Sequence, residues 1–534
     1  MPSARFLGCV LPLALLLAGC GGPAAATQRL KHHAAQPATV DWPLPGQNAW
    51  ADRTAPIAAL TPRTASHLIL AFSDTLGPAG SNNECYPLEQ GGTLYVTGPG
   101  DLVEAVSAAG GNVLWSYRPA AIHQPVWAPV ATRGVALGDG LVFLLTADDQ
   151  LTALDAKTGA VRYSVQVADP AQGYFETMNP IFAQGKVIVG SAGGDEGNRG
   201  FVAAYDALTG QQAWRFYTIP AAGTSWVPAT GHHGGGAVWT SPTFDPQNGL
   251  LYVPVGNPSP DYFGAVRPGP DLYTDSVVAL RIGSGTVAWY RQEVPHDLWD
   301  YDVASPPLVL AVGGRTEVVE AGKDGYLYAW NASTGRAAFR PVAFVREDHR
   351  PPTPQGVIEW PGADGGANYG TSAYEPQTGL IFVAGIQGGM LVRSETTALP
   401  AQPLDFGTSA IDAPGTHWTG TITAVDARTG KIRWQDAIPT PAIGGVTAVS
   451  GGVLLFGQEN GILEAVDAKT GKAVWLDQTG MPIAAAPIVY RRGGVTYVAV
   501  VTGNSASLRS RFPSQAPSEL MVFRLPAKGA VHRR

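Results

Sequence analysis

Short apolar runs joined by turns rich in Asp, Asn and Gly recur along most of the chain. Two clear copies are LTALDAKTGAVRY, which ends at Tyr163, and VAAYDALTGQQAW, which ends at Trp214. In each copy an apolar run leads into a turn with a glycine, and a second run with an aromatic residue follows. Runs of strand length bounded by such turn residues are typical of β-hairpins. The pattern therefore predicts an all-β protein.

Seven copies of this hairpin are visible, and they end at Trp115, Tyr163, Trp214, Trp289, Phe339, Trp434 and Trp475. Most recur about every 40–50 residues, the period of a β-propeller blade. We predict an eight-bladed propeller whose last blade joins GVTYVAVVTG and ELMVFRLP near the C-terminus to SHLILAFS near the N-terminus. Such pairing removes the sheet edges. A seven-bladed ring is the alternative. Longer gaps before residues 285 and 430 predict insertions that could cover one end of the ring.

Composition agrees with many short strands in one large architecture. The 534 residues include 66 glycines and 44 prolines, and only 14% are charged, against about 25% in typical soluble proteins. The net charge of −7 and the absence of a basic run exclude a nucleic-acid partner. We see no second domain and expect a single propeller over residues 41–534.

The N-terminus, MPSARFLGCVLPLALLLAGC, predicts an export signal. Its arginine, its apolar stretch and the final LAGC indicate a lipoprotein signal peptide over residues 1–19, with lipid attached to Cys20. Residues 20–40 are expected to form a flexible tether. An ordinary secretory signal is the alternative. We expect an exported protein that faces the periplasm and whose lipid anchor lies in the outer membrane.

Cysteine usage limits the chemistry further. Once the signal is removed, Cys85 is the only cysteine besides the anchor, so no disulfide framework is expected. No C-x-x-C-H sequence occurs, so no covalent haem is expected in this chain.

The phrase A-x-D-A-x-T-G-x-x-x-W resembles the tryptophan-docking repeat of the pyrroloquinoline-quinone (PQQ) propellers. Two classes of protein share it: quinoprotein alcohol and sugar dehydrogenases, and cofactor-free scaffold lipoproteins of outer-membrane assembly. Segments outside the repeat are similar to the dehydrogenases, from the opening DWPLPGQNAWADRTAP to about residue 505, including GGGAVW and HDLWDYD. The resemblance implies a PQQ-type propeller domain.

The same resemblance implies a metal site and a catalytic base. It places metal ligands at Asp195, Asn257 and Asp300, with Asp300 as general base, and the cofactor-stacking tryptophan at Trp239. Asp302 makes an Asp-x-Asp turn that resembles the extra carboxylate of lanthanide-dependent alcohol dehydrogenases, but membrane-bound sugar dehydrogenases share such a turn. We expect one metal ion, with calcium or magnesium favoured and a lanthanide as the alternative.

Further positions match the family's contacts to the quinone. These positions are Glu84, Arg133, Thr177, Lys323 and Asn368. PQQ is a planar tricarboxylate with an ortho-quinone, so its site needs an aromatic face, cationic rim groups and a Lewis acid. The residues that match the family supply these groups, and the carboxylate and amide oxygens suit calcium-like ions.

Three departures from the family pattern stand out. Trp127 and Ala128 occupy the positions where the alcohol dehydrogenases often have a vicinal Cys-Cys disulfide. Our hypothesis is that Trp127 covers the second face of the quinone; packing between blades is the alternative. Ala237 replaces a polar contact, and Asp195 replaces a glutamate. Asp297, just upstream of Asp300, is predicted to be a structural turn residue.

The leading prediction is a PQQ-dependent dehydrogenase that oxidises an alcohol or sugar hydroxyl by hydride transfer to the quinone. Lacking haem, it would pass electrons to a separate cytochrome c or a membrane quinone. The first alternative is a non-catalytic envelope scaffold, which would need no constellation of carboxylate, asparagine and tryptophan at its mouth. The second is a polysaccharide-binding propeller, which would need exposed aromatic residues along the ring mouth.

Overall fold

The computed structural model describes residues 37–120, 132–224, 226, 234–394 and 408–526, and these residues are almost entirely β-structure. The predicted lipidation site Cys20 and Trp127 lie outside the described residues. Within them, the helical segments are α1 (Pro62–Ala65) and three 3-10 turns, Pro170–Gln172, Gly194–Glu196 and Gly264–Val266. No helix in the described ranges is long and apolar enough to cross a membrane.

The strands of the described residues form nine sheets, eight of which contain four or five strands. Four of these eight sheets contain consecutive strands from the first half of the chain: β3 (Leu88–Gln90), β4 (Thr93–Gly98), β5 (Leu102–Ser107) and β6 (Val113–Tyr117); β7 (Ala136–Gly138), β8 (Leu141–Leu145), β9 (Gln150–Asp155) and β10 (Val161–Gln166); β11 (Ile181–Ala183), β12 (Lys186–Val189), β13 (Phe201–Asp206) and β14 (Gln212–Tyr217); β15 (Thr243–Asp245), β16 (Leu250–Val255), β17 (Ser276–Arg281) and β18 (Val287–Gln292).

The other four large sheets use the second half and two N-terminal strands: β19 (Leu308–Val312), β20 (Arg315–Ala321), β21 (Tyr326–Asn331) and β22 (Val342–Ala343); β24 (Ala373–Glu375), β25 (Leu380–Gln387), β28 (Thr419–Asp426) and β29 (Ile432–Ile438); β30 (Val446–Val449), β31 (Val453–Gly457), β32 (Ile462–Asp467) and β33 (Ala473–Gln478) with β1 (Thr54–Ala55); β34 (Ile488–Arg492), β35 (Val495–Val501) and β36 (Pro517–Arg524) with β2 (Ile69–Ala79). The small sheet contains β23 (Val357–Glu359), β26 (Met390–Ser394) and β27 (Thr408–Asp412).

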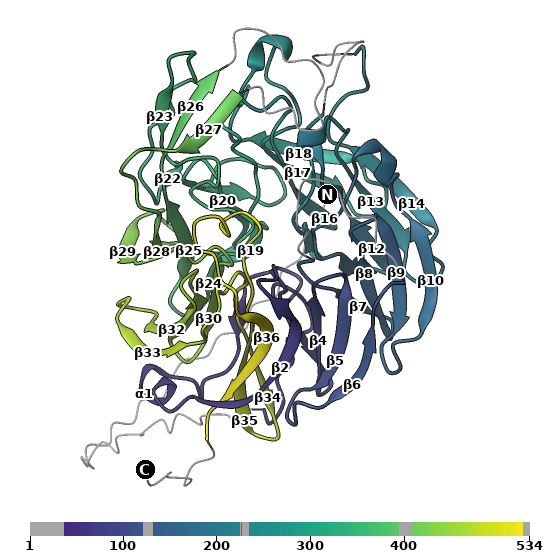
Figure 1. The fold of residues 1–534 in the computed structure, drawn as a ribbon, viewed down its shortest axis with the longest axis vertical. Helices are drawn as coiled ribbons and strands as arrows, with labels where there is room; N and C mark the ends of the chain where they lie inside the picture. The colour runs from purple at the N-terminus through teal and green to yellow at the C-terminus, as the bar shows by residue number, and fades with distance from the viewer. Residues whose placement is uncertain (1–36, 121–131, 225, 227–233, 395–407, 527–534) are drawn as a thin grey trace, which may run out of the picture. The chain divides into compact units, whose positions relative to one another are not determined.

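The predicted pairing of the two ends of the chain is confirmed. Strand β2 pairs antiparallel with β36, with Leu70 opposite Phe523, and β36 pairs with β35. Figure 1 shows the purple β2 beside the yellow β36. One sheet thus combines N-terminal and C-terminal strands, which satisfies the backbone groups that both edges would otherwise expose.

The aromatic residue of each repeat docks onto the next sheet. Trp289 at the end of one repeat donates its indole N–H to the carbonyl of Ala332, 2.9 Å away in the following repeat. Its ring lies against Gly335, where φ is +66° and an added Cβ would collide with the indole. Equivalent bonds join Trp115 to Ala156, Tyr163 to Ala207, Trp214 to Ile282 and Trp434 to Ala468. The repeat is therefore a packing device, and the predicted tryptophan docking is confirmed.

Apolar clusters fill the spaces between successive sheets. One cluster joins Phe143 to Phe201, a second joins Val202 to Leu251, and a third joins Tyr252 to Val309. Inner strands such as β8 and β16 bury side chains on both faces and therefore read as unbroken apolar runs. The described residues form an all-β propeller.

The N-terminal segment is tied to the sheets earlier than predicted. Val40 pairs with Arg491, and the carbonyl of Ala38 accepts a hydrogen bond from Gly494. Residues 37–40, assigned from sequence to the tether, therefore belong to the folded unit, because their backbone groups complete a sheet edge.

A second contact holds the N-terminal segment further along the chain. The buried guanidinium of Arg53 donates a hydrogen bond to the carbonyl of Val446.

Candidate active site

All ten described residues that the sequence predicted to hold a cofactor or metal line one cavity of about 370 Å³. They are Glu84, Arg133, Thr177, Asp195, Trp239, Asn257, Asp300, Asp302, Lys323 and Asn368. They come from segments far apart in the chain, and each lies in a connection between two strands. A volume of this size is in the range of small-molecule and cofactor sites.

Lys323 connects the two carboxylates of the Asp-x-Asp turn. Its Nζ lies 3.0 Å from Asp300 Oδ1 and 2.7 Å from Asp302 Oδ2. The ammonium is buried, whereas the Asp300 side chain keeps 21% of its surface exposed. Asp300 is therefore the member of this triad that is most exposed to the cavity.

The two carboxylates differ because their remaining partners differ. Asp302 Oδ1 accepts hydrogen bonds from Trp239 Nε1 and from the backbone N–H of Asn257, each at 3.0 Å. Burial raises the pKa of Asp302, but Lys323 and these donors outweigh it and lower the pKa below its usual value. Burial raises the pKa of Asp300 well above its usual value, and Asp302 and Asp195 add to the effect against the pull of Lys323.

Asp302 reaches its partners because residue 256 is glycine. An added Cβ at Gly256 would collide with Asp302 Oδ1. Both oxygens of Asp302 are occupied by Trp239, Asn257 and Lys323. In this structure Asp302 orients the indole and the lysine, and its predicted role as a metal ligand stays a prediction.

Asp195 and Asn257 form the other wall of the predicted metal site. Asp195 lies in the 3-10 turn Gly194–Glu196, and left-handed glycines flank this turn on both sides. Burial and the nearby charge of Asp302 raise the pKa of Asp195 to about 6, against the opposing effects of Lys323 and a hydrogen bond with Asn257. The two side chains thus lie side by side at the cavity.

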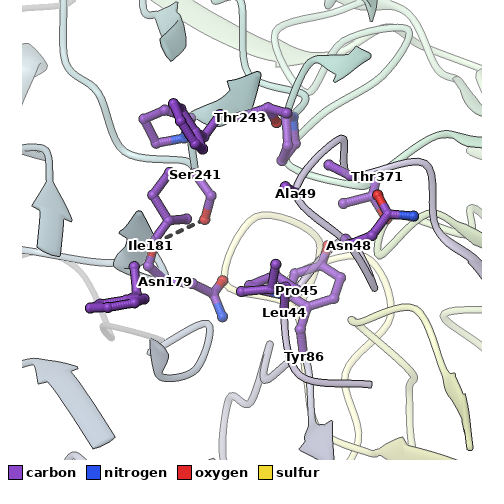
Figure 2. A pocket seen from close by; sticks show the side chains of 16 residues that line it. Leu44, Pro45, Asn48, Ala49, Tyr86, Asn179, Ile181, Ser241, Thr243 and Thr371 are labelled. Atoms are coloured by element: carbon purple, nitrogen blue, oxygen red, sulfur yellow. Dashed lines mark hydrogen bonds between the residues drawn. The ribbon is translucent and has the colours of Figure 1, made fainter. Parts of the chain in front are cut away.

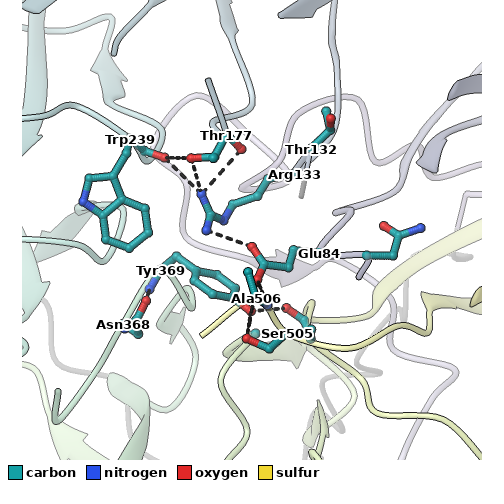
Figure 3. A network of polar contacts seen from close by, with 12 residues as sticks. Glu84, Thr132, Arg133, Thr177, Trp239, Asn368, Tyr369, Ser505 and Ala506 are labelled. Carbon is teal, nitrogen blue, oxygen red and sulfur yellow. Dashed lines mark hydrogen bonds and ion pairs between the residues drawn. The ribbon is translucent and has the colours of Figure 1, made fainter. Parts of the chain in front are cut away.

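A buried network holds Arg133 beside Trp239 (Figure 3). Arg133 Nη2 pairs with Glu84 Oε2 at 2.8 Å, and Nη1 donates to Thr177 Oγ1 at 2.7 Å and to the carbonyl of Trp239 at 3.1 Å. The guanidinium also lies 4.9 Å from the centre of the Trp239 ring. A fixed positive charge therefore stands at the edge of a half-buried aromatic face.

Sequence reasoning missed several residues of this network. Tyr369 packs edge-on against Trp239 and under the Arg133 guanidinium. Ser505 and Ala506 donate to Glu84 Oε1 at 3.4 and 2.8 Å, from the far end of the chain. The remaining lining residues that were missed are Phe175, Ala192–Gly194, Ala363, Asp364 and Ser507. Only Tyr369, directly after Asn368 in GANYG, had a usable signal.

Comparison with known proteins identifies this arrangement. A family model described as "Glucose/ethanol/alcohol dehydrogenase, beta-propeller domain" matches residues 42–347. The quinohemoprotein alcohol dehydrogenase ADH IIB of Pseudomonas putida is 32% identical, over 97% of this chain and 81% of the relative. The chain belongs to the PQQ-dependent alcohol dehydrogenase family. The quinoprotein alcohol dehydrogenase PedH of Pseudomonas putida is 30% identical, over 92% of this chain and 90% of the relative.

Solved structures of this dehydrogenase family are also similar. The quinohemoprotein alcohol dehydrogenase ADHIIG of Pseudomonas putida HK5 superposes with a TM-score of 0.83 and 27% identity, over 92% of this chain and 81% of the other. A europium-containing methanol dehydrogenase superposes with a TM-score of 0.81 and 26% identity, over 91% and 98%. A second family model, "Outer membrane protein assembly factor BamB", matches residues 419–509.

The cavity residues fit PQQ. Trp239 offers an aromatic ring face for the planar cofactor. Arg133 Nε is buried and has no hydrogen-bond partner among the described residues, so it could donate a hydrogen bond to an anionic group. Ala237, the second departure from the family pattern, lines the cavity without a polar group. Trp127, which the sequence analysis placed over the second face of the quinone, is not among the described residues, and its role stays a hypothesis.

The cavity residues meet the requirements of a metal ion less completely than those of PQQ. Five carboxylates and two cationic side chains line the cavity, and this excess of negative charge favours a bound cation. Yet in the part of the chain that the structure describes, no three His, Cys, Asp or Glu side chains converge closely enough to hold a metal by themselves. Asp195, Asn257 and Asp300 would hold a hard cation jointly with oxygens of the cofactor.

A second, smaller cavity of about 70 Å³ lies beside the N-terminal segment (Figure 2). Leu44, Pro45 and Ala49 line it together with Tyr86 and Asn179. No charged side chain is among its described lining residues. This cavity therefore lacks the groups that a tricarboxylate or a metal ion requires.

Proposed function

We propose that the protein oxidises an alcohol hydroxyl with PQQ as the electron acceptor and Asp300 as the general base. The observation that carries the proposal is the single cavity in which the Asp300 carboxylate, the Lys323 ammonium and the Trp239 ring meet. An alcohol is favoured over a sugar because the named relatives are alcohol dehydrogenases.

When bound, PQQ supplies an ortho-quinone that accepts a hydride from the alcohol carbon. Trp239 would stack on one face of the ring system, while Arg133 and Lys323 would pair with its anionic groups. Asp300 would accept the hydroxyl proton, and burial raises the pKa of this carboxyl above its usual value, which strengthens it as a base. Lys323 holds this carboxylate in place at 3.0 Å.

A metal ion would bind through Asp195, Asn257 and Asp300 and act as a Lewis acid toward the quinone oxygen. We favour calcium or magnesium and keep a lanthanide as the alternative. The side chain of Asp195 is shorter than the glutamate that the family usually has, so the ion would have to shift toward it or a water would have to lie between them. Electrons would leave to a separate cytochrome c or membrane quinone. We further propose that the eight large sheets are eight blades of one ring and that the protein is exported and anchored through Cys20.

A scaffold function is the second candidate, because the BamB family model matches residues 419–509. That segment holds two copies of the docking repeat, which both classes share. The Arg133–Glu84 ion pair and the Asp300–Lys323–Asp302 triad lie outside it. A scaffold has no need for charges buried around a cavity, so the dehydrogenase is favoured.

The substrate class is tested with the anchor-free protein loaded with PQQ and calcium or a light lanthanide. Dye-linked oxidation would be measured for primary alcohols, diols and aldose sugars. We expect kcat/KM for the best alcohol to exceed that for every sugar by at least tenfold. Asp300→Ala serves as the control. Equal or higher values for sugars would overturn the choice of alcohol, and no turnover by any compound would count against the enzyme.

A further inference from the structure

The turn that presents Asp300 has an uncommon backbone conformation. Asp300 has φ of +62°, and His296 in the same turn has φ of +55°. For a residue other than glycine the left-handed region is strained, so surrounding contacts must hold it. Something in the fold must therefore fix residues 296–302.

The carboxylate of Asp297 supplies that restraint. One oxygen, Oδ1, accepts the backbone N–H of Trp299 at 3.1 Å, and the other, Oδ2, accepts the backbone N–H of Tyr301 at 3.0 Å. These two amides belong to the residues on either side of Asp300. Asp297 is fully buried, so the bonds are shielded from water. One side chain thus uses both oxygens to set the peptide planes that aim Asp300.

Contacts with Arg267 and between the rings of the turn itself also restrain residues 296–302. Buried Arg267 donates from Nη2 to the carbonyl of Asp297 at 2.7 Å and forms an ion pair with Asp271. On the other side, Tyr301 stacks on Trp299, with ring centres 6.0 Å apart and planes 14° from parallel. None of these contacts uses the Asp297 carboxylate, so we expect them to remain when that carboxylate is altered and the effect of a substitution to stay within the turn.

We infer that Asp297 is a positioning residue for the reaction: its carboxylate holds Asp300 in the orientation needed to accept the substrate proton. This role rests on the proposed function of Asp300. It requires an acceptor at both oxygens. Asparagine keeps only one acceptor, and its amide N–H₂ would face a backbone N–H, so Asp297→Asn removes one bond while preserving size.

A matched control exists in another turn. Asp245 is also fully buried, and its Oδ1 accepts the backbone N–H groups of Gln247 and Asn248 at 2.9 and 3.4 Å. It does not line the cavity. Asp245→Asn therefore measures what the loss of a buried turn carboxylate does to the fold alone.

The test uses the full-length variants loaded with PQQ and metal, and hydrogen–deuterium exchange of the unloaded proteins over residues 296–302. In Asp297→Asn we expect kcat to fall about 10²-fold, as for an Å-scale misplacement, with alcohol KM and PQQ Kd within twofold. Amides of the turn should exchange at least tenfold faster. Asp245→Asn should leave both unchanged, and Asp297→Asn should lower activity no further in an Asp300→Asn background.

Wild-type kcat or unchanged exchange in Asp297→Asn would overturn the inference, as would an equal loss of kcat in Asp245→Asn. If wild-type protein binds no PQQ, the proposed function fails. The exchange measurement distinguishes that outcome, because it tests the hold on the turn without cofactor or turnover.

Discussion

Replacing Lys323 with methionine removes the positive charge between two buried carboxylates and keeps the length of the side chain. At the observed Nζ–O separations of 3.0 and 2.7 Å, each attraction is about 5–6 kcal/mol at an effective dielectric constant of 20, before desolvation. Breaking buried pairs by removing one partner typically costs about 3–5 kcal/mol. We therefore expect Lys323→Met to lower the free energy of unfolding by about 3–5 kcal/mol at pH 8.

The loss should depend on pH. Coulombic attraction to Lys323 is the largest influence that lowers the pKa of Asp300 against its burial. Without the ammonium, Asp300 and Asp302 become neutral by binding protons, so the loss should shrink at pH 5. Urea unfolding followed by tryptophan fluorescence measures both values. The exposed Lys157, at a hairpin turn, provides the control Lys157→Met, expected to change stability by less than about 0.5 kcal/mol. Equal losses in the two variants at pH 8, or no dependence on pH, would refute the reasoning.

Three further predictions concern other contacts in the structure. Trp289→Phe removes the bond to the Ala332 carbonyl and should destabilise the protein by about 1–3 kcal/mol in urea unfolding; an unchanged midpoint would contradict the docking role. Asp302→Ala frees the Trp239 indole and should weaken metal-free PQQ binding about tenfold by fluorescence titration; unchanged affinity would assign Asp302 to the metal alone. Burial raises the pKa of the Asp149 carboxyl to about 7. Between about pH 4 and 7 the folded protein therefore keeps a proton on Asp149 that the unfolded chain has lost. The contribution of Asp149 to stability should decrease as the pH rises through this range. Thermal melts of wild type and Asp149→Asn across this range should therefore converge toward acid pH, and parallel curves would contradict the shift.

The sequence allowed the repeat architecture to be predicted because its packing is local. A docking residue such as Trp289 lies 43 residues from its acceptor Ala332, one repeat along, so every copy carries the same signal. The joining of the chain ends was predictable for the same reason: the leftover strands near Ile69 and Arg524 each lacked a partner. Local periodicity and unpaired edges suffice for such features.

The candidate site could be predicted only in part. Resemblance located Asp300 and Lys323, but nothing in the sequence shows that their side chains meet. The bond between Ser505 and Glu84 spans 421 residues, and no periodic pattern reports such a contact. Asp302 illustrates the limit: the Asp-x-Asp turn resembles a metal-binding turn of the family, but the sequence did not show that Asp302 contacts Trp239 and Lys323, which lie 63 and 21 residues away.

The central claim is tested most directly by dye-linked oxidation of a primary alcohol under four conditions: no addition, PQQ alone, metal alone, and both. Asp300→Asn is assayed beside wild type, with PQQ binding followed by quenching of tryptophan fluorescence. The account predicts turnover only when PQQ and metal are both present, and at least a 10³-fold loss in Asp300→Asn with PQQ still bound. A wild-type protein that binds no PQQ, or turnover that survives in Asp300→Asn, would contradict it.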